Sequence, residues 1–460
     1  MGKTGMGKTR VEKKSTKISS QISSKKHQKK RGSNQKVMQN VQLHENVLST
    51  LKPTPEEKKK FAAAVGLFIK QLNSKLKGAQ AILGGSGAKG TWLSGSYDID
   101  IFVKFEGQAW HDSSPEELSD TLHDALKKAF PQKKISRLHG SRDYFQIQEG
   151  NQEGKYVFEI VPIMKITKAS KAKNITDISP LHSIWVNKHV KHKEEVLLAK
   201  QFCKAQGLYG AESHIRGFSG YGLEILLAAY STFEQFLRAS LAWKAKEVID
   251  PAKHYPKKDA LFHLNKSKQL SPIIIIDPVD HDRNAAAALS EEKLQILRKK
   301  AREYLRKPSE QFFVKQAFDL EKLQLQGHVA VIHVLPLSGK RDVVGAKLLK
   351  CYEFLKKNLE GYGIKASGWD WNLFYFVVEQ EMMPKVQIRK GPPITLQENA
   401  QDFKKKNKDT YLEQGILYAR VPTEHPLLHD CVASAVKDPY VLEKVKSIKG
   451  VQVLEHSVRK

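Results

Sequence analysis

The chain has 460 residues, 40% of them hydrophobic, and this length is enough for about three domains with buried cores. Its formal net charge of +28 at pH 7 argues against an ordinary enzyme of small neutral substrates and indicates a polyanionic partner, first of all nucleic acid. Three widely spaced cysteines exclude a disulfide framework, and the sequence contains neither a transmembrane stretch nor a secretory signal, so we expect a soluble protein of the reducing cytoplasm.

The N-terminal segment is strongly basic and almost free of apolar residues. Residues 1–36 carry twelve Lys or Arg against one Glu, a net charge of +11. Such a segment buries too little apolar surface to offset its ordering entropy, so we interpret residues 1–45 as a disordered basic N-terminal arm. Residues 2–9 match the P-loop pattern GxxxxGK[ST], but a P-loop needs a strand before it, and we reject that interpretation.

The next segments predict a helix, a strand and a glycine-rich turn. Thr54-Pro55-Glu56-Glu57 is typical of a helix start, and apolar residues continue at helical spacing to Leu72. Residues 81–83 read as a short apolar strand that breaks into Gly84-Gly85-Ser86, with one or two helical turns at 87–93. The backbone amides and hydroxyl of such a turn are suited to a phosphate group.

Two carboxylates follow on a second strand. Ile99, Ile101 and Val103 alternate as in a strand, which places Asp98 and Asp100 on the same face, their Cα atoms roughly 6.5–7 Å apart. A solvated strand end is the alternative explanation of such a pair.

A lone acid, Glu159, lies in a third apolar strand at 155–163, which we expect to pair with residues 144–148. If Glu159 lies beside Asp98 and Asp100, the three carboxylates repel one another by roughly 3 kcal/mol per pair at ~5 Å and an effective dielectric near 20. They must then take up protons or bind a cation, and hard oxygen ligands suit Mg²⁺.

These features resemble the nucleotidyltransferase superfamily related to DNA polymerase β. The resemblance narrows to the archaeal, class I CCA-adding enzymes, the tRNA nucleotidyltransferases, through segments that occur in the family's order at residues 85–102, 179–185, 208–221, 277–286, 389–393 and 415–419. It implies transfer of nucleotides from CTP and ATP to the 3′ end and acceptor arm of tRNA with two Mg²⁺ ions.

The resemblance also assigns roles to single residues. Asp98, Asp100 and Glu159 are implied to be the catalytic and metal-binding carboxylates, and Ser86 and Lys89 are implied to contact the triphosphate. The sequence departs from the family twice, with Glu159 where an Asp is usual and Lys89 where an Arg is common. Glutamate is still a hard oxygen ligand, and lysine supplies a point charge in place of a bidentate fork.

Four further residues match the family's nucleotide pocket. His182, Lys200 and Tyr209 are implied to line its triphosphate and sugar side, and Arg283 is implied to help recognise the base. From the residues alone, each has an ordinary explanation. His182 would cap a helix, Lys200 would lie on a solvated helix face, Tyr209 would pack in a turn, and Arg283 would be an ion-pair partner.

We therefore expect an α+β multidomain protein. Its predicted parts are the arm, a polymerase-β-like nucleotidyltransferase head at 46–185, a helical central domain at 186–310, and an α+β C-terminal RNA-binding domain at 311–460. The central domain should contain helices at 196–202, 223–241 and 291–305, and the last domain should have strand–helix–strand order. Template-independent CCA addition is the function we infer. A poly(A) or terminal uridylyl transferase and a non-catalytic RNA-binding protein are the alternatives, and the sequence leaves open whether the protein is a homodimer.

Overall fold

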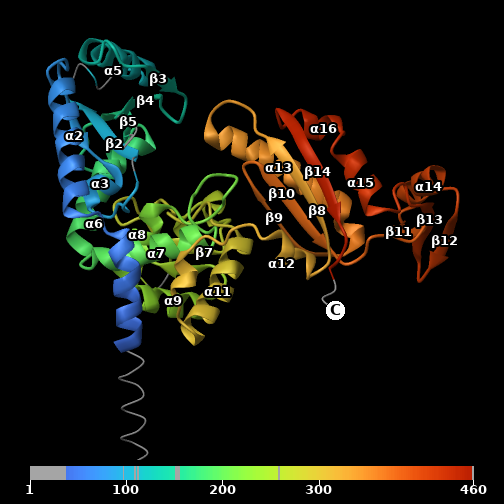
Figure 1. Ribbon diagram of the computed structural model, residues 1–460. Helices are drawn as coiled ribbons and strands as arrows, with labels where there is room; N and C mark the ends of the chain where they lie inside the picture. The colour runs from blue at the N-terminus through green and yellow to red at the C-terminus, as the bar shows by residue number, and fades with distance from the viewer. Residues whose placement is uncertain are drawn as a thin grey trace, which may run out of the picture. The chain divides into compact units, whose positions relative to one another are not determined.

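The computed structural model describes residues 38–96, 98–107, 110, 113–150, 156–256 and 259–457. The chain divides into two compact units, Met1–Gln316 and Ala317–Lys460 (Figure 1). Most of the predicted basic arm, with the rejected P-loop pattern, lies outside the described residues. In the described ranges no helix is both long and apolar enough to cross a membrane.

A five-stranded mixed sheet forms the head of the first unit. Its strand order is β1-β2-β5-β4-β3, with β2 and β5 parallel and the other neighbours antiparallel. The predicted pairing of residues 144–148 with the third strand is confirmed. The strands are β1 (Ala79–Leu83), β2 (Asp98–Phe105), β3 (Ile135–Leu138), β4 (Tyr144–Glu149) and β5 (Tyr156–Met164).

Two helices, α2 (Pro55–Asn73) and α5 (Pro115–Ala129), cover one face of this sheet (Figure 1). Each begins with a capping box and a proline in its first turn, which confirms the helix start predicted at Thr54. Odd-numbered residues of β2, such as Ile99 and Ile101, pack beneath them in the core. The even-numbered residues therefore face the other side of the sheet.

Helices dominate the rest of the first unit. They are α3 (Gly85–Lys89), α6 (Ser179–His189), α7 (Lys193–Ala205), α8 (Gly220–Tyr230), α9 (Phe233–Ala242), α10 (Ala260–His263) and α11 (Glu291–Arg306), beside a two-stranded parallel sheet of β6 (Glu247–Ile249) and β7 (Ile273–Ile275). The first unit includes both the head and the helical region, so the predicted boundary at residue 185 stays a prediction.

Two details of the sequence prediction are wrong here. Residues 38–51 are helical, and Val47 and Leu51 are buried in the helical core, so residues 38–45 do not belong to a disordered arm. The single helix expected at 223–241 is two helices, α8 and α9. Ser231 has a φ of 66° after α8, and the side chain of Thr232 caps the start of α9, so the chain turns between them.

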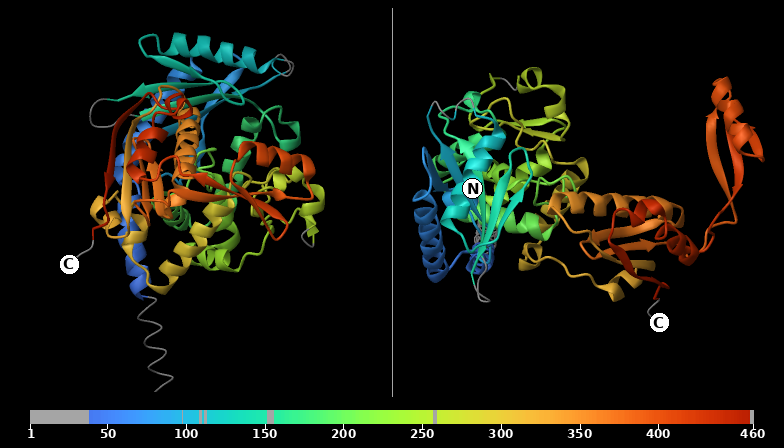
Figure 2. Two further views of the ribbon diagram at one scale, coloured as in Figure 1. Left: turned by 90° about the vertical axis from the view of Figure 1, so that its right-hand side faces the viewer. Right: turned by 90° about the horizontal axis from the view of Figure 1, so that it is seen from above.

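The second unit contains two sheets, drawn apart from one another in Figure 2. An antiparallel sheet of order β14-β8-β10-β9 packs against α13 (Arg341–Leu359), α15 (Leu428–Ala435) and α16 (Pro439–Leu442), while α12 (Leu320–Gln324) contacts its other face. The strands are β8 (His328–Leu335), β9 (Ile364–Asp370), β10 (Leu373–Val378) and β14 (Ser447–Leu454). The predicted order of strand, helix and strand is confirmed, although β9 intervenes before the second predicted strand.

A small antiparallel sheet of order β11-β13-β12 completes the second unit, with α14 (Gln397–Lys406) against β11. Its strands are β11 (Val386–Pro393), β12 (Thr410–Glu413) and β13 (Ile416–Pro422). The two C-terminal segments that carry the family resemblance, 389–393 and 415–419, pair with each other in this sheet through β11 and β13.

Candidate functional site

The three predicted carboxylates lie on neighbouring strands near their N-terminal ends. In the parallel pair of β2 and β5, Asp100 is the register partner of Glu159, and Asp98 is the partner of Val157. Register partners on adjacent strands point to the same face, so all three acids share the face that α2 and α5 leave free. Asp98 is exposed, while Asp100 and Glu159 are partly buried.

The environment of Asp100 is unusual for a carboxylate. Burial raises the pKa of Asp100 to about 6, and the negative charges of Glu159 and Asp98 contribute, although Lys89 opposes them. The Glu159 Oε1 atom accepts a hydrogen bond of 2.6 Å from Gln146 Nε2 on β4. The predicted mutual repulsion of the acids is therefore present at Asp100.

The acids fit a divalent cation in donor type. Asp98, Asp100 and Glu159 offer hard carboxylate oxygens on one face, which is the ligand chemistry that Mg²⁺ prefers. In the side-chain arrangement described, no three His, Cys, Asp or Glu residues within the described ranges gather closely enough to hold an ion. The residues that could hold a metal are thus placed by the strand register on one face of the sheet.

A glycine-rich turn brings α3 against Asp100. Gly85 has a φ of +52°, and a Cβ atom built on it would lie 1.6 Å from Asp100 Oδ2. Only glycine allows this contact between the turn and the carboxylate. Because α3 starts at Gly85, Ser86 and Lys89 are carried on the element that adjoins β2, close to the acids.

Two predicted phosphate-binding lysines meet at a buried carboxylate that the sequence analysis overlooked. Glu224 on α8 is 0% exposed and accepts hydrogen bonds from Lys89 Nζ at 2.6 Å and from Lys200 Nζ at 2.9 Å. Thr91 Oγ1 also donates to Glu224, at 2.6 Å. Burial alone would raise the pKa of Glu224, but the charges of Lys200 and Lys89 outweigh burial and lower that pKa to about 2.

A second buried acid, Asp277, organises the other side of the pocket. Its carboxylate is within 3.0 Å of His182 Nε2, accepts from Arg283 Nη1 at 3.1 Å and accepts from Tyr221 Oη at 2.9 Å. The rings of His182 and Tyr221 stack with centroids 3.9 Å apart. Burial lowers the pKa of His182, while its hydrogen bond to Asp277 opposes that shift.

The two groups of residues adjoin each other. Lys89 Nζ lies 5.6 Å from the centroid of the Tyr221 ring, which connects the Glu224 group with the Asp277 group. Tyr209 lies beside the Glu224 group, because both contact Gly220. A Cβ atom built on Gly220 would lie 2.8 Å from Tyr209 Oη and 3.7 Å from Lys200 Nζ. The structure therefore brings together Lys89, His182, Lys200, Tyr209 and Arg283.

The structure supports some of the ordinary explanations given above for the four pocket residues and contradicts others. Lys200 is only 3% exposed, so the solvated helix face is wrong. The ion pair expected for Arg283 is confirmed by its contact with Asp277. His182 lies inside α6 and is not its cap, and Tyr209 packs partly against the helical core.

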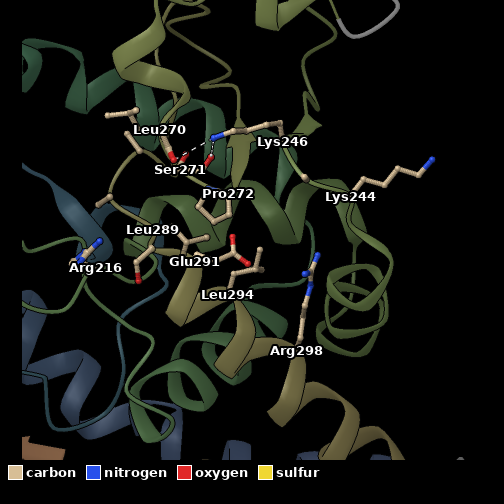
Figure 3. A pocket seen from close by; sticks show the side chains of 14 residues that line it. Arg216, Lys244, Lys246, Leu270, Ser271, Pro272, Leu289, Glu291, Leu294 and Arg298 are labelled. Atoms are coloured by element: carbon tan, nitrogen blue, oxygen red, sulfur yellow. Dashed lines mark hydrogen bonds between the residues drawn. The ribbon is translucent and has the colours of Figure 1, made fainter. Parts of the chain in front are cut away.

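A separate cavity of about 520 Å³ lies between the start of α11 and the loops at 244–246 and 270–272 (Figure 3). Two of its cationic residues already hold backbone carbonyls: Lys246 Nζ donates to Ser271 O at 2.9 Å, and Arg298 Nη2 donates to Trp243 O at 2.6 Å. None of the predicted site residues lines it. Lys246 and Arg298 therefore stabilise the fold of the helical region.

Comparison with known families gives two matches in the first unit. Residues 65–182 match the family described as nucleotidyltransferase domain, and residues 194–314 match the one described as tRNA nucleotidyltransferase, second domain. The first match spans the acids and α3, and the second spans Lys200, Tyr209, Glu224 and Arg283.

Several curated relatives cover nearly the whole chain. The CCA-adding enzyme of Methanosarcina barkeri is 30% identical over 89% of this chain and 93% of its own length, and that of Nanoarchaeum equitans is 35% identical over 80% and 90%. Among solved structures, a cytoplasmic RNA terminal U-transferase covers 60% of this chain and 98% of its own, with 14% identity and a TM-score of 0.45. A Cid1 poly(U) polymerase covers 60% and 99% at 14% identity and a TM-score of 0.48.

Proposed function

The chain belongs to the family of archaeal-type CCA-adding enzymes, and on this premise we propose that it adds C, C and A to the 3′ end of tRNA from CTP and ATP without a nucleic-acid template. The observation that carries this proposal is the extent of the match, which takes in 89% of the chain and therefore residues of both compact units. The net charge of +28 is suited to a tRNA partner.

Asp98, Asp100 and Glu159 would hold the two Mg²⁺ ions. When bound, the metal supplies a neutralising charge for the triphosphate and lowers the pKa of the hydroxyl at the 3′ end of the tRNA. Asp100 is the central ligand in this proposal, because it lies between Asp98 along β2 and Glu159 across the sheet, and its contact with Gly85 adjoins the phosphate-binding turn.

The triphosphate would lie along α3 and the buried lysines. Ser86 offers a hydroxyl, and Lys89 and Lys200 offer two ammonium groups, which bind phosphate oxygens through charge-assisted hydrogen bonds. His182 would contact the triphosphate and sugar side, supported by Asp277 at 3.0 Å. Tyr209, partly buried beside Gly220, would close the same side of the pocket.

Arg283 would read the base edge. Its guanidinium carries several donors, one of which is used by Asp277 at 3.1 Å, and its side chain remains 34% exposed. Donors left free can bond acceptors that C and A both present. Selection between CTP and ATP would then depend on how the growing 3′ end shapes the pocket around Arg283.

The protein would act in the cytoplasm, where its substrates occur. Cys203, Cys351 and Cys431 are free and buried in the structure, as suits a reducing compartment.

The product length separates this proposal from other terminal transferases. The protein is incubated with tRNA that lacks its CCA end, with Mg²⁺ and with CTP and ATP singly and together, and products are resolved on a denaturing gel. CCA addition requires two additions with CTP alone, three with both nucleotides, and then a stop. A long adenosine ladder with ATP alone would instead establish a poly(A) polymerase, and no addition at all would support a non-catalytic RNA-binding protein.

Variants of the acids test the roles proposed for them. Asp98→Ala and Asp100→Ala should lower turnover by several orders of magnitude while tRNA binding in gel shifts stays nearly unchanged, and Glu159→Asp should keep measurable activity. Asp120, an exposed acid on α5 across the sheet, is the matched control, and Asp120→Ala should retain full turnover. Near-normal turnover of Asp100→Ala would contradict the proposed site.

A further inference from the structure

Glu224 is a charged residue in an apolar setting. It is the single acid among the apolar residues Leu223 to Ala229, lies in the middle of α8 and is fully buried. A carboxylate in such a position strongly destabilises a fold unless it is paired and hydrogen-bonded. The residues that bind the Glu224 carboxylate must therefore explain how the fold tolerates it.

The partners come from two separate elements and use both carboxylate oxygens. Lys89 of α3 binds Oε2 at 2.6 Å, and Lys200 of α7 binds Oε1 at 2.9 Å. Lys200 Nζ also donates at 3.0 Å to both the carbonyl oxygen and the Oγ1 atom of Thr91. The two ammonium groups are thus held by different oxygens of one carboxylate.

The charges in this cluster do not balance. One carboxylate faces two ammonium groups, so the cluster keeps a net positive charge inside the protein. Burial lowers the pKa of Lys200, and the charge of Glu224 opposes that shift. The other titratable groups that interact with the cluster or with its lysines are Asp100 on β2, His182 on α6, Lys193 and Lys204 on α7, Tyr221 on α8, and Tyr209 in the loop before α8.

We propose that Glu224 is a positioning residue of the nucleotide pocket, which holds Lys89 and Lys200 together in the charged form so that both are ready for a triphosphate. The proposal rests on the function proposed above for the two lysines. Glu224 acts through them and does not itself touch the nucleotide. A triphosphate then meets two fixed cations and does not have to organise two mobile ones, which lowers the cost of binding.

The isosteric variant Glu224→Gln removes the charge and keeps the shape. Two buried ammonium groups then lack a counter-ion, and one of them should lose its proton near neutral pH. In the unfolded chain the same lysine stays protonated up to pH ~10.4. The unfolded state therefore binds more protons than the folded one, and the stability of the variant should rise with pH.

The first experiment needs no nucleotide. Urea unfolding of the full chain is measured from pH 7 to 9.5 for wild type, Glu224→Gln and the matched control Asp177→Asn. Asp177 is also buried, but it pairs at 2.6 Å with Arg142, and arginine does not lose its proton in this range. The deficit of Glu224→Gln relative to wild type should shrink by up to tenfold in the unfolding equilibrium constant per pH unit, whereas the deficit of Asp177→Asn should stay constant.

A deficit of Glu224→Gln that is constant with pH would overturn the proposal. If Glu224→Gln does not fold, the double variant Glu224→Gln/Lys200→Met decides, because it removes one of the two uncompensated cations. We expect the double variant to be more stable than Glu224→Gln, and a double variant that is equally or less stable would overturn the proposal.

The second experiment measures CTP binding with Mg²⁺ by calorimetry between pH 7.5 and 9. Binding to Glu224→Gln should weaken by up to tenfold per pH unit relative to wild type, and Glu224→Asp, which restores the charge, should return to the wild-type slope. Parallel slopes for wild type and Glu224→Gln would overturn the proposal. A wild-type protein that binds neither CTP nor ATP would overturn the proposed function, and the unfolding experiment would still decide whether Glu224 keeps the lysines charged.

Discussion

Replacing Asp100 by Asn should make the metal-free protein more stable at pH 8 while it abolishes turnover. Burial, Glu159 and Asp98 raise the pKa of Asp100 from 3.8 to about 6. The folded state therefore binds this proton more tightly than the unfolded chain, so stability falls as pH rises through this range. A difference of about two pKa units corresponds to about 3 kcal/mol at about 1.4 kcal/mol per unit, lost fully above pH ~6 and not at all below pH ~4.

The assay is urea unfolding of wild type and Asp100→Asn in EDTA at several pH values between 3.5 and 8.5. The variant should be more stable by about 1–3 kcal/mol at pH 8, the lower figure allowing for hydrogen bonds that the amide does not reproduce. The two proteins should converge below pH ~4. Added Mg²⁺ should stabilise wild type by an amount that grows with the logarithm of the Mg²⁺ concentration above the dissociation constant, and should leave the variant unchanged.

A variant that is less stable than wild type at pH 8 in EDTA would refute this reasoning, and so would a gap that persists below pH ~4. Asp120→Asn is the control, because the side chain of Asp120 is 65% exposed. Its stability should stay within about 0.5 kcal/mol of wild type at pH 8.

The pocket and the basic arm can be tested by three further changes. Gly220→Ala places a methyl group 2.8 Å from Tyr209 Oη, so steady-state kinetics should show a KM for CTP at least several-fold higher, and an unchanged KM would contradict the close packing. Asp277→Asn removes the counter-ion of Arg283. The ratio of kcat/KM for the correct nucleotide to that for the incorrect nucleotide should fall by about tenfold at each step, as expected for the loss of one charged hydrogen bond. An unchanged ratio would contradict a role of Asp277 in positioning Arg283. Deletion of residues 1–36 should leave turnover at saturating tRNA within a few-fold of the full-length value. The slope of log affinity for tRNA against log salt should fall by roughly 0.7–0.9 for each phosphate that the arm neutralises. An unchanged slope would show that the arm does not touch tRNA.

The sequence predicted the carboxylate face because strand periodicity is a local property. Alternation along β2 is enough to place Asp98 and Asp100 on one side, and the turn predicted at 149–154 indicated the hairpin of β4 and β5. The register of Asp100 with Glu159 depends on β2 and β5 being parallel neighbours, which is decided by packing of distant segments. The sequence could therefore suggest that Glu159 lies beside Asp100, but strand periodicity alone could not establish it.

The anchors of the nucleotide pocket were missed although one of them carried a signal. Glu224 is a lone acid in an apolar run, as Glu159 is, and the same reasoning would have singled it out. The helical pattern around Lys200 did not indicate that its side chain is buried, because the position of a residue on a helix does not reveal which other element packs over it. The buried ammonium group of Lys200 binds Thr91 and Glu224, which lie 109 and 24 positions away in the sequence.

The contact between Lys89 and Glu224 spans 135 positions of the chain, and this has a consequence during synthesis. At ~5–20 residues per second, a ribosome needs roughly 7–27 s to reach Glu224 after it has made Lys89. Within that interval the nascent chain gains Asp98 and Asp100, then Glu159 and Lys200, while the lysines still lack the carboxylate that binds them both. A translation product that stops before α8 would thus carry the catalytic acids and still be inert toward CTP and ATP.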